Sequence, residues 1–106
     1  MPALLISDVT IRDHAAFQQY RELAAASIEA FGGRYLVRGG EIEVLEGERH
    51  PSNLVVVEFE STEVARRWYA SAEYAKALEF RDRALSRSLI LVDGLNGQVG
   101  TPATDA

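Results

Sequence analysis

Two Gly-Gly pairs, seven residues apart in the segment FGGRYLVRGG, limit the folds open to this chain. Glycine accepts the positive φ angles that other residues avoid, so such pairs mark the ends and reversals of elements. Gly32 and Gly33 follow an apolar helical stripe and predict a helix C-cap and a chain reversal. Gly39 and Gly40 separate the alternating segments RYLVR and EIEVLE and predict a hairpin turn. The segment opens no helix and does not fit G-x-G-x-x-G. We therefore interpret its glycines as marking the ends of a helix and a strand, and not as a nucleotide-binding loop.

Hydrophobic periodicity predicts the other elements. In chain order we expect a strand at 3–10, a helix after the N-cap Asp13, strands at 34–38, 41–46 and 54–59, helices after the N-caps Ser61 and Ser71, and a strand at 88–94. This β-α-β-β-α-β order, with an extra hairpin strand and a split second helix, predicts a ferredoxin-like α+β fold with helices on one face of an antiparallel sheet. We expect the strand order 4-1-3-2, with strands one and three as parallel neighbours. Residues 1–95 are expected to form one domain and 96–106 a loosely held tail.

Side-chain alternation along the strands predicts a sheet that is apolar on both faces. The face assigned to the helix-covered core carries Leu5, Ser7, Val9, Tyr35, Val37, Val55, Val57, Phe59, Ile90 and Val92. The second face carries Leu4, Ile6, Asp8, Arg34, Leu36, Arg38, Leu54, Val56, Glu58, Leu89, Leu91 and Asp93. No predicted helix remains to cover its seven aliphatic side chains, and an apolar patch of this kind marks an interface. We therefore expect a homodimer that packs these second faces together.

Composition excludes several classes of function. The chain has no cysteine, which rules out disulfides and thiolate-ligated metals, and its net charge of −5 argues against a nucleic-acid partner. His14 and His50 lack partners at ligand spacing, so we expect neither a metal nor another cofactor. The apolar runs LVVV and LILV are too short to cross a bilayer, and the N-terminal segment does not read as a signal peptide. We expect a cytoplasmic protein without a membrane partner.

The segments FGGRYLVRGG, LEG, EFES, WYAS and EY, together with Ala65, resemble a family of small bacterial proteins of unknown function. The resemblance covers about residues 3–95. That family belongs to the dimeric α/β-barrel superfamily of ferredoxin-like folds, so the resemblance implies a dimer whose two sheets form a barrel. The wider superfamily includes cofactor-free monooxygenases, muconolactone isomerases and haem-dependent chlorite dismutases. For the close family, the resemblance implies no reaction and no catalytic residue.

Arg81 is the most specific candidate for ligand binding. At 100° per residue it falls on the apolar stripe of the last helix, about 20° from Tyr74. A guanidinium there needs a partner, because an unpaired buried charge is costly. Two interpretations remain open: an anion anchor beside Tyr74, or an arginine whose stem packs while its head reaches solvent or an acid such as Glu58.

Charged residues of the second face form another candidate cluster. Asp8 and Glu58 are expected to meet at one edge of the sheet, where the strand that starts with Arg34 begins. Two neighbouring carboxylates can act as an acid and a base, or they can belong to a structural ion pair or a wet rim. Arg38 and Asp93 are expected toward the opposite end of this face. They too can belong to a functional site, or to a structural ion pair or a solvated rim.

Aromatic residues of the helices complete the candidates. We expect Trp68 in the core, whereas Tyr69 points off the stripe toward a cleft mouth, where it and Tyr74 can bind an aromatic ligand. These features predict a homodimeric barrel that binds a small anionic or aromatic metabolite between sheet and helices, with cofactor-free oxygenase or isomerase chemistry as one version. The alternative is a non-catalytic dimerisation or interaction module without a substrate. A cavity of a few hundred Å³ with convergent polar groups would favour the first interpretation.

Overall fold

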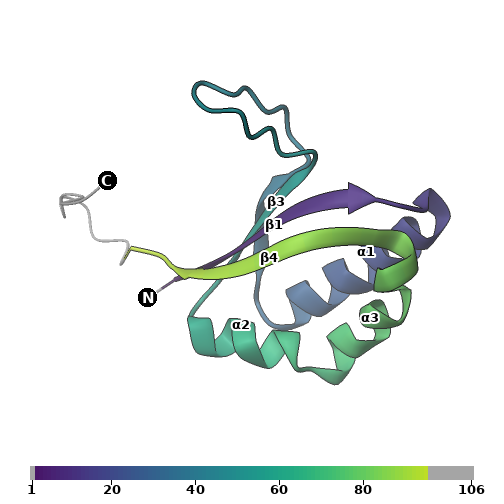
Figure 1. Ribbon diagram of the computed structural model, residues 1–106. Helices are drawn as coiled ribbons and strands as arrows, with labels where there is room; N and C mark the ends of the chain where they lie inside the picture. Colours follow the sequence, from purple (N-terminus) through teal and green to yellow (C-terminus); the bar gives the residue numbers. More distant parts are fainter. Residues whose placement is uncertain (1, 96–106) are drawn as a thin grey trace.

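Four strands and three helices make up the computed structural model, which describes residues 2–95 (Figure 1). The elements are β1 Ala3–Ile11, α1 His14–Ala30, β2 Arg34–Arg38, β3 Leu54–Phe59, α2 Thr62–Tyr69, α3 Ala72–Ala84 and β4 Leu85–Asp93. All three helices cover the same face of the sheet (Figure 1). The predicted ferredoxin-like α+β architecture is confirmed. The tail expected at 96–106 lies outside the described residues.

The sheet has the order β2-β3-β1-β4, and all neighbouring strands are antiparallel. The order agrees with the prediction, but the expectation that the first and third major strands run parallel is wrong. Leu5 lies opposite Val57 and Asp8 opposite Leu54, so β1 and β3 run in opposite directions. The reason is topological: α1 returns the chain to its starting side, so β2 runs parallel to β1, and the β2–β3 connection then reverses the chain.

Local capping signals define the helix ends as predicted. The Asp13 side chain accepts hydrogen bonds from the backbone N–H groups of Ala15 and Ala16, and Ser61 and Ser71 accept from the N–H groups three residues ahead. At the end of α1, Gly32 adopts a φ of +73°. Because this angle is unfavourable for residues with a Cβ, the glycine allows the chain to turn toward β2.

The connection between β2 and β3 differs from the expected extra strand. Residues 41–46 form no strand, and the connection stands out from the sheet as an extended arm (Figure 1). Gly39 at its base has a φ of +73°, and its N–H donates to the carbonyl of Leu54 at 3.0 Å. Leu45 within the arm is 84% exposed. An isolated hairpin is marginally stable in water, so alternation alone does not make a strand where no neighbour exists.

The two faces of β4 were predicted in reverse. Leu91 lies opposite Leu5, so Leu89 and Leu91 face the helices, whereas Ile90 and Val92 face away from them. Residues 89–92 are all apolar, so alternation could not show which of them face the helices. The register against β1 decides the matter, because a shift of one residue exchanges the two faces.

A register shift in β2 corrects two further assignments. Tyr35 lies opposite Val57, but after a shift between Tyr35 and Val37 the next pair joins Val37 to Val56. Arg38 therefore turns to the helix side of the sheet and Val37 to the other side, the reverse of the prediction. A β-bulge inserts a residue into a strand and so breaks simple alternation.

The sheet face without helices, called the outer face below, remains apolar after these corrections. Its seven aliphatic residues are Leu4, Ile6, Val37, Leu54, Val56, Ile90 and Val92. Ile90 is 55% exposed and Val92 40%. Within the part of the chain that the structure describes, no helix covers this face (Figure 1). The sheet is therefore apolar on both sides, as expected, although Leu89 and Leu91, which were predicted on the outer face, lie on the helix side.

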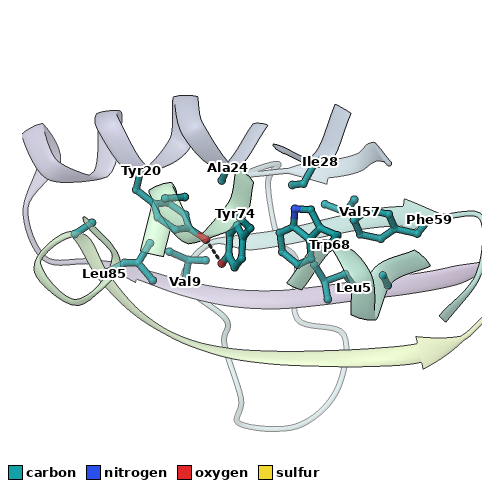
Figure 2. Packing of buried hydrophobic residues seen from close by; sticks show 13 residues of the cluster. Leu5, Val9, Tyr20, Ala24, Ile28, Val57, Phe59, Trp68, Tyr74 and Leu85 are labelled. Atoms are coloured by element: carbon teal, nitrogen blue, oxygen red, sulfur yellow. Dashed lines mark hydrogen bonds between the residues drawn. The ribbon is translucent and has the colours of Figure 1, made fainter. Parts of the chain in front are cut away.

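The core between sheet and helices is built around aromatic side chains (Figure 2). Trp68 is 1% exposed, and its ring centroid lies 4.1 Å from that of Tyr74 and 5.5 Å from that of Phe59. The indole Nε1–H donates to the Ser27 hydroxyl at 2.9 Å, and Ser27 donates in turn to the Ala24 carbonyl at 2.7 Å. The one polar group of the tryptophan is thus satisfied inside the core.

Candidate functional site

A cavity of about 300 Å³ lies between α1 and the helix side of the sheet; we call it the α1 pocket. Its apolar walls come from α1 and from three strands, and include Val9, Phe17, Ala24, Val55, Leu85 and Leu89. Its polar lining consists of Ser7, Tyr20, Arg21, Arg38, Asn53 and Arg87, beside Tyr35. The pocket thus joins an apolar interior to several hydrogen-bond donors, a combination typical of small-molecule sites.

The charge of the α1 pocket is one-sided. Three arginines line it, and no aspartate or glutamate is among its lining residues in the described chain. The whole protein, by contrast, carries a net charge of −5. Guanidinium groups form strong, charge-assisted hydrogen bonds with carboxylates and other oxyanions. The local electrostatics therefore favour an anionic ligand.

Arg38 from the edge strand β2 lies at one end of the pocket. Its guanidinium carbon lies 4.3 Å from the centroid of the Tyr35 ring, a cation–π contact that holds the charge beside the cavity. Asn53 lies close to Gly39, the residue that follows Arg38: a Cβ atom added to Gly39 would stand 2.9 Å from Asn53 Oδ1. Burial raises the pKa of Tyr35, while Arg38 and Arg21 oppose that shift.

Arg87 from β4 forms the inner end of the pocket together with two tyrosines. One of its nitrogens donates to the Tyr20 hydroxyl at 2.8 Å and the other donates to the Tyr74 hydroxyl. The two phenol oxygens lie 2.7 Å apart, as the dashed line in Figure 2 shows. Burial raises the pKa of Tyr20 far above its ordinary value, with a smaller contribution from Tyr74 that outweighs Arg87. Tyr20 is therefore a neutral hydrogen-bond donor at neutral pH.

Ser7 on the central strand β1 supplies an unpaired polar group in the same pocket. The residue is 4% exposed, and among the described residues its hydroxyl has no hydrogen-bond partner. A buried polar atom without a partner costs free energy, and an oxygen or nitrogen of a bound molecule would remove that cost.

The structure places the predicted ligand-binding residues in different parts of the molecule. Arg38 lines the α1 pocket, and Tyr74 contacts its inner end. Arg81 and Tyr69 instead line a second hollow of about 370 Å³ beside α3 and β4, which shares Leu85, Arg87 and Leu89 with the α1 pocket. Arg81 is not a buried anchor beside Tyr74: its Nε lies 3.4 Å from Asp82 Oδ1, and Asp82 is largely exposed. Partial burial opposes the charge of Arg81, but Asp82 and Tyr69 outweigh it and raise its pKa.

The predicted cluster of Asp8, Glu58 and Arg34 does not form as one group. Arg34 Nε lies 2.8 Å from Glu58 Oε1 on the outer face, which is the structural ion pair that the sequence left open. Asp8 lies at the other end of β1, where it accepts from the Ser52 N–H at 3.2 Å. Because β1 and β3 are antiparallel, the two carboxylates cannot meet at one edge of the sheet.

Sequence reasoning missed Arg87, Tyr20, Arg21, Asn53 and Ser7 as site residues. For Arg87 a signal existed, since it precedes Leu89 by two positions and shares its face once β4 begins at Leu85. The predicted strand began too late to include it. In the sequence Tyr20 falls on one apolar stripe of α1 with Phe17, Ala24 and Ile28, and such a stripe gives no sign of a partner for its hydroxyl.

Two features are absent from residues 2–95. No group of three or more His, Cys, Asp or Glu side chains there is arranged to hold a metal ion. Also, none of the helices in these residues combines the length and the apolar character needed to cross a membrane.

Comparison with known families places the chain. The model of the domain of unknown function DUF1330 matches residues 2–95, which carry the whole sheet, the three helices and the α1 pocket. The chain belongs to the DUF1330 family. The resemblance found in the sequence is thereby confirmed at the level of the family. Among curated proteins, none matches this DUF1330 chain in sequence.

Solved structures share the fold. A protein of unknown function from Rhodopseudomonas palustris superposes with a TM-score of 0.73 at 19% identity over 90% of this chain and 83% of its own. SnoaB, a cofactor-independent oxygenase from Streptomyces nogalater, gives 0.59 at 14% identity over 94% and 98%. A DABB-family protein from Mesorhizobium loti with a ferredoxin-like fold gives 0.53 at 9% identity over 90% and 98%. At these identities the likeness shows the fold and nothing further about this DUF1330 protein.

Proposed function

We propose that this DUF1330 protein binds a small organic anion in the α1 pocket, one with a flat apolar body such as an aromatic ring. One observation carries the proposal: three arginines and no carboxylate line a cavity whose other walls are mostly apolar. The cavity of about 300 Å³ lies at the small end of the range for ligand pockets, which favours a single-ring metabolite. The unpaired Ser7 hydroxyl also favours a pocket that holds a ligand, because a bound molecule would give this buried group a hydrogen-bond partner.

Chemistry of the cofactor-free oxygenase or isomerase type is one use of such a site. Both reactions pass through an enolate-like or phenolate-like oxyanion, and hydrogen-bond donors fixed before the reaction stabilise that charge. Arg87 and Tyr20 offer such donors at the inner end of the pocket. The fold that SnoaB shares with this chain supports this version of the proposal. The alternative of a module without a ligand is weaker, since it leaves the arginine-lined cavity without a role.

Replacing Arg38 by Gln tests the binding function. We expect wild-type protein to bind benzoate-type carboxylates in a thermal-shift and calorimetric screen, and R38Q to bind the same hits about tenfold more weakly, because a charge-assisted hydrogen bond is lost. Arg66 on the exposed side of α2 gives a matched control: R66Q removes the same charge outside the pocket and should leave the dissociation constants unchanged. Equal weakening by R66Q, or no binding of any small carboxylate or phenol by wild type, would contradict the proposal.

We also propose that the protein is a homodimer that buries the outer face. Val37, Val56, Ile6 and Ile90 lie opposite one another in a single row across all four strands of this face. A second copy offers the same apolar surface, and a two-fold axis would bring the two rows into contact. Light scattering after size-exclusion chromatography should give twice the mass of one chain at micromolar concentration. A single-chain mass over that range would refute the dimer and leave the pocket proposal intact.

A further inference from the structure

We propose that the inner end of the α1 pocket is an oxyanion site in which the Tyr20 hydroxyl, supported by Arg87, donates a hydrogen bond to the ligand. The ligand would then be two-ended, with a carboxylate at Arg38 and a second, electron-rich oxygen at Tyr20. This inference rests on the proposed function, because it assigns the pose and the chemical class of the molecule bound in the same pocket.

The number of protons in the tyrosine pair carries the first step. Arg87 donates to both phenol oxygens, and these oxygens lie in hydrogen-bond contact with each other. Only one of the two hydroxyl protons can lie between them. The other proton must point away from the pair, toward a different acceptor.

Burial decides which tyrosine carries that outward proton. Tyr74 is 0% exposed, and among the described residues its hydroxyl hydrogen-bonds only to Tyr20 and Arg87. If Tyr20 donated to Tyr74, the Tyr74 proton would have no acceptor, because the Tyr20 proton would already lie between the two oxygens and a guanidinium accepts no hydrogen bond. Tyr20, by contrast, lines the cavity. Leaving the Tyr74 proton inside the core would cost a buried, unpaired donor, whereas Tyr20 borders the cavity, where a bound molecule can accept its proton. Tyr74 therefore donates to Tyr20, and the Tyr20 hydroxyl donates into the pocket.

The charge at this end of the pocket points to an anionic oxygen. Arg87 is half-buried, and none of the salt bridges of the described chain includes it. Phenol oxygens accept from two of its five N–H groups without neutralising its charge. A ligand oxygen with negative charge would accept from Tyr20 and compensate Arg87 at the same time.

The layout of the sheet separates the two ends of the ligand. Arg38 lies on the edge strand β2 and Arg87 on the opposite edge strand β4; the two strands are three strand spacings or about 14 Å apart, and Arg87 is offset by two residues from the row of Arg38. Between them the floor of the cavity is mostly apolar, with Val55, Val9 and Leu89 around the hydroxyl of Ser7. Both arginines line the cavity, so we infer a single ring with oxygen groups at opposite ends, one for each charged end, across the mostly apolar middle.

Two probes that differ by one oxygen test this pose. We expect 4-hydroxy-3-nitrobenzoate to bind wild-type protein about tenfold more tightly than 3-nitrobenzoate in calorimetry, since only the former offers an oxyanion to Tyr20 and Arg87. Its phenolate absorbs visible light, so a titration should also show that binding lowers the pKa of the probe's own phenol. In Y20F the tenfold preference should vanish, while 3-nitrobenzoate binds within about twofold of its wild-type affinity.

Tyr74→Phe provides the comparison for a lost core hydroxyl. Y74F removes a phenol oxygen from the same pair but leaves Tyr20 with its outward proton and its bond from Arg87, so we expect it to retain a preference of about threefold or more. Thermal unfolding of both variants checks that each is folded.

The outcomes separate this inference from the proposed function. Equal affinities of the two probes for wild type, or a preference that survives in Y20F, would overturn the oxyanion site while the pocket proposal stands. A bound probe whose phenol pKa is not lowered in wild type would overturn it as well, whatever the stability of Y20F. Failure of both probes and of all other carboxylates to bind wild type would overturn the proposed function and the inference together.

Discussion

Replacing Trp68 by Ala is expected to lower the free energy of unfolding by roughly 3–5 kcal/mol, the range for a large aromatic residue deleted from a core. Trp68 is 1% exposed and lies between Phe59 and Tyr74, so its truncation removes the contacts of both rings and leaves a cavity beside the α1 pocket. The substitution also leaves the Ser27 hydroxyl without the N–H group that it accepts from. Both losses act in the same direction.

Urea unfolding followed by far-UV circular dichroism measures this effect. Fluorescence is unsuitable, because Trp68 is the only tryptophan of the chain. All proteins are compared at one concentration, since a dimer would make the midpoint concentration-dependent. Leu45→Ala is the control: this residue is 84% exposed, and its truncation should cost less than about 0.5 kcal/mol. A loss below about 1.5 kcal/mol for W68A would show that the core does not close around the indole.

Replacing Ile90 by Asp is expected to raise the dissociation constant of the proposed dimer by at least about a thousandfold. Ile90 lies opposite Ile6 in the aliphatic row of the outer face, and a two-fold axis would place both introduced carboxylates in one interface. A buried, unpaired charge costs several kcal/mol, and each 1.4 kcal/mol corresponds to a factor of ten. The side chain is 55% exposed in a single chain, so folding of the subunit should change little.

Light scattering over a dilution series measures the shift from dimer to monomer, and circular dichroism checks that the fold is kept. Leu45→Asp introduces the same charge on the exposed arm and should leave the mass of the particle unchanged. If I90D remains a dimer at the same concentrations as wild type, the outer face is not the interface.

The candidate site was only partly visible in the sequence. Arg38 and Tyr74 were identified as ligand-binding candidates, yet Arg38 was placed on the wrong face and Tyr74 beside the wrong arginine. The hydrogen bonds of the inner end join residues that are 67, 54 and 13 positions apart. No periodicity in a single sequence encodes such pairs, because each member reads locally as an ordinary core or surface residue.

Local signals predicted the order of elements and the ends of the helices. Asp13 caps α1 through N–H groups two and three residues away, and Ser71 caps α3 in the same way. Gly32 takes up the predicted positive φ. Each of these features needs only neighbours along the chain, so the residues themselves determine it.

Tertiary structure decided which way the strands face. A bulge in β2 turned Arg38 into the α1 pocket, and the register of β4 against β1 brought Arg87 in and turned Ile90 out. The sequence by itself determined that the sheet is apolar on both sides; the pairing between strands determined which side chains share the pocket. The physical reason is that alternation has a period of two, so one shifted or inserted residue exchanges the faces, and only contacts across the sheet hold that register.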